Sequence, residues 1–169
     1  MRFALLALAL TAVVPAANAQ PAGPNPQIDY GGFAILTGEV EAYRQDRLLS
    51  WSQFADAADD AGVLILDARS ERAFADGHIR GAVNLPLPDF TEESLAQTIG
   101  QDPNRRILIY CNNNFSNNAY PVVRKLVTVA LNIQTFINLY GYGYRNVHEL
   151  GEVVNFNDPR IPWVARSAS

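Results

Sequence analysis

Short apolar runs, each ending in a polar residue or a glycine, mark the strands of this sequence. The clearest run is ILIY at 107–110, and VLIL at 63–66 is equally apolar. Shorter runs lie at 48–49 and 82–85, and a last strand is predicted at 145–150. Continuous apolar strands that alternate with helical patterns are typical of a parallel sheet covered on both faces. The pattern therefore predicts an α/β fold.

Helical periodicity fills the intervals between these runs. Apolar residues at positions 33, 36, 40 and 43 fit a helix. Ser50 and Gln53 have the form of a capping box that opens a helix to about residue 60, and Thr91 caps another. Asn117 or Asn118 is predicted to cap a helix at 119–128, and Asn132 is predicted to cap one at 132–140. A short helix is also predicted at 71–76.

The single cysteine, Cys111, directly follows the most apolar run. A polar loop, NNNFSNN at 112–118, separates it from the helix predicted at 119. The thiol therefore lies at the carboxyl end of a buried strand, where loop N–H groups and a helix dipole favour the thiolate. These two effects predict that the pKa of Cys111 lies below its free value of about 8.5. A lowered pKa would make the thiol reactive, because the thiolate is the nucleophile. The alternative is that Cys111 is a small buried core residue.

The first residues have the form of a secretory signal peptide. Arg2 gives a positive start, residues 3–14 are apolar, and a small-x-small cleavage pattern ends at Ala19. We expect cleavage after Ala19, a disordered proline-rich leader over 20–30 and a single domain over 31–165. The product is expected to be periplasmic or secreted. An N-terminal membrane helix is the alternative.

Composition limits the partners of this chain. The net charge is −4 at pH 7, and signal cleavage removes one positive charge, Arg2. An acidic chain is a poor match for nucleic acid or for an anionic membrane surface. One Cys and two His give no metal-ligand pattern, so we expect no metal or other cofactor. A single exported cysteine cannot form an internal disulfide, so it is buried, paired with another molecule, or reactive.

Three stretches resemble the rhodanese family. Residues 66–86, LDARSERAFADGHIRGAVNLP, carry the pattern Asp-x-Arg, a short helix, and Gly-His-Ile-x-Gly-Ala-x-Asn-Leu. The strand, cysteine and loop at 107–118 are similar to the family's active-site loop, and YRNVHELG at 144–151 is similar to its final strand. The resemblance covers about residues 48–152. It implies a three-layer α/β/α sandwich around a mainly parallel five-stranded sheet, with ligands at the carboxyl edge.

The resemblance also implies a sulfurtransferase in which Cys111 carries a persulfide. We predict Cys111 as the catalytic nucleophile and the loop after it as the substrate-binding segment. The loop residues are Asn112, Asn113, Asn114, Phe115, Ser116 and Asn117. Phe115 is predicted to form an apolar wall beside the thiol. The predicted supporting residues are Asp67 and Arg69, as a salt bridge, and His78, which is expected to fix a turn by hydrogen bonds.

The loop departs from the family pattern because neither Gly nor Arg follows the cysteine. Asn117 stands where phosphatase relatives need an Arg, which argues against phosphatase chemistry. Without a loop cation, the dianion thiosulfate is expected to be a poorer donor than a neutral persulfide. The extra segment at 128–140 is expected to lie far from Cys111, because the helix before it leads away from the carboxyl edge.

The favoured hypothesis is therefore a sulfurtransferase. It takes sulfane sulfur from a small donor through a Cys111 persulfide to a thiol or cyanide acceptor. One alternative is a rhodanese-fold module in the periplasm that binds sulfur or a protein partner without turnover. Another is a redox protein that forms mixed disulfides through Cys111. The sequence leaves open the identity of donor and acceptor, a protein partner and the oligomeric state.

Overall fold

The structure, a computed structural model, describes residues 23–166. The predicted signal peptide over 1–19 and the first part of the predicted leader lie outside the described residues. Within residues 23–166, none of the helices combines the length and the apolar character that a bilayer crossing needs.

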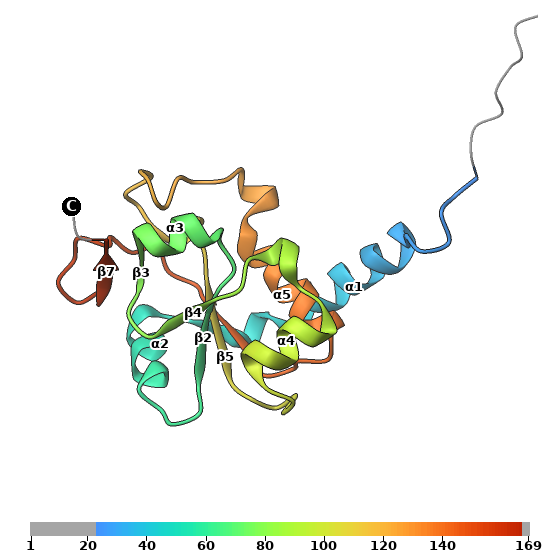
Figure 1. Cartoon of the computed structure of the whole chain (residues 1–169), viewed down its shortest axis with the longest axis horizontal. Coiled ribbons are helices and arrows are strands. Elements are labelled where there is room, and N and C mark those ends of the chain that lie inside the picture. Colours follow the sequence, from blue (N-terminus) through green and yellow to red (C-terminus); the bar gives the residue numbers. More distant parts are fainter. Residues whose placement is uncertain (1–22, 167–169) are drawn as a thin grey trace, which may run out of the picture.

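A five-stranded parallel sheet forms the centre of the fold (Figure 1). Its strand order is β1-β6-β5-β2-β4, and every neighbouring pair is parallel. The strands are β1 Leu48–Leu49, β6 Val147–Leu150, β5 Ile107–Tyr110, β2 Leu64–Asp67 and β4 Ala82–Asn84. The predicted parallel sheet is confirmed, with strand ends that differ by one or two residues. Because β5 is the middle strand, Cys111 follows the most protected strand of the sheet.

Helices cover both faces of this sheet. On one face lie α1, α4 and α5, and on the other lies α2, as the two sides of the strands in Figure 1 show. The bounds are α1 Tyr30–Tyr43, α2 Trp51–Ala58, α3 Glu71–Asp76, α4 Glu92–Ile99 and α5 Leu131–Gly141. Two short 3-10 turns join helices to strands. They are η1 Gln45–Arg47, between α1 and β1, and η2 Leu87–Asp89, between β4 and α4. The three-layer sandwich expected from the sequence is confirmed.

The helix starts predicted at Ser50 and Thr91 form as expected. The Ser50 Oγ accepts a hydrogen bond from the Gln53 N–H, and the Gln53 Oε1 accepts one from the Ser50 N–H. Thr91 and Ser94 exchange hydrogen bonds in the same way at the start of α4. Each exchange satisfies N–H groups that the first turn of a helix leaves without a partner.

The helix predicted at 119–128 does not form. After Cys111 the chain makes one 3-10 turn, η3 Asn112–Asn114, and then runs without helix to η4 Val127–Val129. Asn118 has a left-handed φ of 44°, and the segment holds several β-branched residues, which lose side-chain freedom in a helix. The next helix, α5, begins only at Leu131, so Asn132 lies in its first turn and Ala130 occupies the cap position.

A second, two-stranded sheet was not predicted. In it β3 Gly77–Ile79 pairs antiparallel with β7 Trp163–Ala165. A Cβ atom at Gly77 would lie 2.7 Å from the Trp163 ring, so only glycine permits this approach. Trp163 packs against the core of the α2 face.

Candidate active site

Cys111 lies at the carboxyl end of β5 with only 1% of its surface exposed. The Asn113 N–H donates to Cys111 Sγ, with an N···S distance of 3.4 Å. The backbone N–H groups of Asn132 and Asn114 also lie close enough to favour the thiolate. Asn132 belongs to the first turn of α5, so the helix N-terminus expected beneath the thiol is present but comes from α5.

This position makes the segment at 128–140 part of the site. The prediction that this segment lies far from Cys111 is wrong at its start, because Asn132 approaches the sulfur. The reasoning assumed a helix after Cys111 that carries the chain to the opposite edge of the sheet. Without that helix, the chain stays near the carboxyl edge until α5 begins.

The pKa of the Cys111 thiol is raised above its ordinary value. Burial is the largest cause, since it penalises the charged form, and the Glu149 carboxylate acts in the same direction. The N–H groups of Asn113, Asn132 and Asn114 oppose both. The expectation of a lowered pKa is therefore contradicted. The N–H groups are present as expected, but desolvation outweighs them.

Asn114 joins the loop to the end of the neighbouring strand. Its Oδ1 accepts a hydrogen bond from the Cys111 N–H at 2.9 Å. Its Nδ2 donates to the carbonyl oxygens of Leu150 at 2.6 Å and Glu152 at 3.1 Å. The Asn114 side chain therefore holds the cysteine against β6, and its hydrogen-bonding groups are occupied by the protein itself.

The structure does not bring the second half of the predicted loop to the thiol. Phe115 is fully buried on the α2 face, with ring centroids 5.0 Å from Trp163 and 5.9 Å from Tyr110. Ser116 donates its N–H to Val154, and Asn117 bonds to the chain near residue 155. These contacts fasten residues 115–117 to the tail that follows β6, so an apolar wall by Phe115 is not observed.

Beside the cysteine loop lies a cleft of about 520 Å³. Its walls include Arg69, Asn112, Tyr120, Lys125 and Leu131. Lys125 is fixed by its backbone, because Asn113 Oδ1 accepts the Lys125 N–H and Asn113 Nδ2 donates to the Lys125 carbonyl. Sequence reasoning missed Lys125 as a site residue. The available signal was that it is the single lysine of the chain, a few residues beyond the loop.

Asp67 and Arg69 form the predicted salt bridge, which is confirmed and fully buried. Arg69 Nη2 lies 2.5 Å from Asp67 Oδ2, and the Tyr110 hydroxyl donates to the same oxygen at 2.6 Å. Arg69 also donates to the carbonyl oxygens of Gly77 at 2.7 Å and Pro121 at 3.2 Å. Each charge is thus compensated within the protein. Although Arg69 lines the cleft, its guanidinium is already committed to these partners.

His78 holds a turn, as the sequence predicted. Its Nδ1 lies 2.8 Å from the Phe74 carbonyl oxygen, and its ring stacks on the Phe74 ring at 3.9 Å. Because both contacts stay within α3 and β3, His78 stabilises the link between them. It does not line the cleft beside Cys111.

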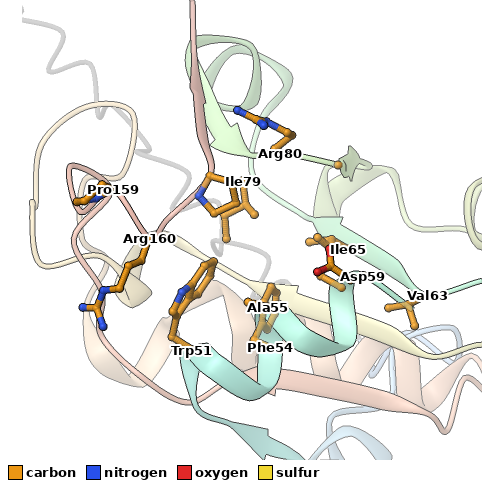
Figure 2. A pocket seen from close by; sticks show the side chains of 13 residues that line it. Trp51, Phe54, Ala55, Asp59, Val63, Ile65, Ile79, Arg80, Pro159 and Arg160 are labelled. Atoms are coloured by element: carbon orange, nitrogen blue, oxygen red, sulfur yellow. The ribbon is translucent and has the colours of Figure 1, made fainter. Parts of the chain in front are cut away.

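A second cleft, of about 380 Å³, lies on the α2 face. Figure 2 shows Trp51 and Ala55 of α2 and its C-cap residue Asp59 on one side, with Ile79, Arg80 and the tail residues Pro159 and Arg160 around the opening. It shares no lining residue with the cleft beside Cys111. The Arg160 guanidinium is held by Asp158 at 2.6 Å, so the charges at the mouth are partly compensated.

The arrangement defines a class of protein, an α/β/α domain with a cysteine at the carboxyl end of its central parallel strand. The family model described as "Rhodanese-like domain" matches residues 50–151. The chain therefore belongs to the rhodanese-like domain family. No curated protein matches the sequence.

Several solved structures are similar to this one. A probable thiosulfate sulfurtransferase is 24% identical, with a TM-score of 0.49 over 71% of this chain and 48% of that chain. A rhodanese-like domain from Anabaena sp. is 18% identical, with a TM-score of 0.49 over 73% of this chain and 83% of that one. Wild-type EanB is 19% identical, with a TM-score of 0.47 over 69% of this chain and 26% of that one. This chain thus spans about a quarter of EanB.

Proposed function

We propose that this rhodanese-like domain is a sulfurtransferase in which Cys111 carries the transferred sulfur as a persulfide. One observation supports this most directly. The single cysteine of the chain ends the central strand of a parallel sheet, and the N–H groups of Asn113, Asn114 and Asn132 stabilise negative charge on its sulfur. Fixed N–H donors placed where charge develops lower the barrier of such a transfer.

The proposed reaction has two displacement steps. First the Cys111 thiolate attacks the outer sulfur of a sulfane donor, which forms a new S–S bond and breaks the donor's own sulfur–sulfur bond. The donor leaves with that electron pair, as sulfite from thiosulfate or as a thiolate from a persulfide. Then a thiolate or cyanide attacks the outer sulfur of the persulfide, takes it as a persulfide or thiocyanate, and returns the electron pair to Cys111. No net oxidant or reductant is required.

The cleft beside Cys111 is the proposed entrance for the donor. Lys125 contributes a cation there, while the charge of Arg69 is compensated by Asp67. Because Cys111 itself is almost fully buried, the loop must yield by a small movement before a donor reaches the sulfur. The short turn η3, with Asn113 partly exposed, is the part of the loop that borders both the cleft and the thiol.

The test is sulfur loading of the purified protein. After incubation with a sulfane donor and removal of the excess, we expect intact-mass spectrometry to find one added sulfur atom on Cys111, released by cyanide as thiocyanate. Because burial raises the pKa of Cys111, loading should accelerate as the pH rises from neutrality, in step with the thiolate fraction. Cys111→Ser should abolish loading without changing the melting temperature substantially. Loading retained by this variant would overturn the proposal.

A rhodanese-like module without turnover is the second candidate. The observation that favours it is the 1% exposure of Cys111 together with its raised pKa, which makes the resting thiol protonated and covered. A module that binds only a protein partner should gain no sulfur at any pH at which the protein stays folded, and one that binds sulfur should load but transfer none to a thiol acceptor. The loading experiment, followed by transfer to a thiol acceptor, therefore separates the two functions.

A further inference from the structure

The Glu149 carboxylate sits in a hydrogen-bond network that reaches the reactive cysteine. Asn132 Nδ2 donates to Glu149 Oε1 at 3.2 Å and to Asn114 Oδ1 at 3.0 Å. The same Asn114 oxygen accepts the Cys111 N–H. Glu149 on β6 is paired in register with Ile109 on β5, so the side chains of Glu149 and Ile109 extend from the same face of the sheet. Cys111 follows Ile109 by two residues.

The other oxygen of the Glu149 carboxylate is bound by Arg44, which lies before the residues that the family model matches. Arg44, the cap residue at the end of α1, donates from Nε at 3.0 Å and from Nη2 at 2.9 Å to Glu149 Oε2. The family match begins at residue 50, so Arg44 and the helix that it caps precede the matched segment. Two donors of one guanidinium on one oxygen form a strong, oriented contact.

We propose that Glu149 and Arg44 are positioning residues that adjust the charge state of Cys111, the carboxylate adding to the burial that disfavours the thiolate and the guanidinium limiting this contribution. A carboxylate near a thiol disfavours the thiolate, because two like charges repel each other in a poorly solvated site. The Arg44 guanidinium partly neutralises the Glu149 carboxylate and so weakens its repulsion of a thiolate at Cys111. The helix α1 thereby influences the reactivity of a thiol on the central strand.

Few other charges face this network. Glu41 of α1 lines the same cleft of about 420 Å³ as Arg44 and Glu149, but no ion pair involving it is found among the described residues. The Glu152 carboxylate accepts a hydrogen bond from the Trp51 N–H instead. Arg44 is 31% exposed and Glu149 is buried, so the pair is reached from solvent on the Arg44 side.

The test measures the thiol without any sulfur donor. Thiolate formation is followed by ultraviolet absorbance against pH, with Cys111→Ser as the blank, and by the rate of alkylation. Glu149→Gln should raise the thiolate population and the alkylation rate near neutral pH severalfold, because the repelling charge is removed. Arg44→Gln should lower the rate. Glu41→Gln, on the same helix and cleft, is the control and should leave it unchanged.

A double variant decides whether Arg44 acts through Glu149. With Gln at position 149, the further change Arg44→Gln should have no effect on the thiolate, since the charge that it modulates is gone. An unchanged pH profile in Glu149→Gln would overturn the inference, and so would a change in the same direction from both single variants. The inference takes from the proposed function that Cys111 reacts. Because no sulfur transfer is measured, a failure of sulfur loading would leave this result standing.

Discussion

At the scale of single residues, the burial of His148 makes the free energy of unfolding depend on pH. It lies on β6, where Nδ1 is buried without a partner among the described residues and Nε2 lies 3.0 Å from Asn146 Oδ1. Burial lowers its pKa from 6.5 to about 4, and the charges of Arg106 and Arg47 act in the same direction. The folded protein thus resists protonation of a group that the unfolded chain protonates readily.

The consequence is a loss of stability in acid. Between pH 6.5 and about 4 the unfolded chain binds a proton at His148 that the folded chain does not, so the free energy of unfolding should fall as the pH falls through this range. Below about pH 4 both states are protonated and this contribution levels off. Urea unfolding of the parent and of His148→Gln, compared at several pH values, measures it. The same slope in both proteins would contradict the assignment to His148.

At the scale of elements, the start of α2 depends on one side chain. Ser50 caps the helix through Gln53, as its spacing in the sequence predicts. Ser50→Ala should lower the free energy of unfolding by about 1 kcal/mol, because the Gln53 N–H loses its side-chain acceptor. Ser52→Ala, an exposed position in the same first turn, should change stability by less than about 0.5 kcal/mol and serves as the control.

The segment between the cysteine loop and α5 shows how strongly local pattern is limited by tertiary contacts. Pro121 and the asparagines before it are compatible with a helix start, yet no helix forms there. The side chain of Asn113 binds the backbone at Lys125, and that of Asn118 binds the N–H of Arg124. These bonds from side chains to the backbone take the place of helical hydrogen bonds, and the β-branched residues of the segment do not favour a helix.

At the scale of the whole molecule, the cleft beside Cys111 is built from segments far apart in the sequence. The loop alone has no basic side chain, but the fold adds Lys125, whose charge has no recorded ion pair among residues 23–166. The charge argument against thiosulfate, drawn from the loop alone, is therefore incomplete. A single cation offers a dianionic donor partial compensation as it enters the cleft.

This makes donor choice depend on Lys125. If the proposed sulfur transfer holds, Lys125→Ala should reduce kcat/KM for thiosulfate about fivefold, the effect of losing one partly exposed charge contact, and should spare a neutral persulfide donor. Arg124→Ala changes the neighbouring cation, which does not line the cleft, and should affect neither donor. An equal loss for both donors in Lys125→Ala would place the effect on folding rather than on charge.

The sequence by itself determined the five strands of the main sheet, their parallel arrangement and the position of Cys111 at the end of a buried strand. These follow from local runs of apolar residues and from capping side chains, which depend on few neighbours. It also indicated that Asp67 and Arg69 pair, since the two lie within one short motif. Only the tertiary structure decided the environment of the thiol. The N–H group of Asn132 and the carboxylate of Glu149 come from two other elements, and both contribute to the balance that raises the pKa of Cys111. The spacing of residues along the sequence does not reveal these contacts, because they form only when distant segments pack together.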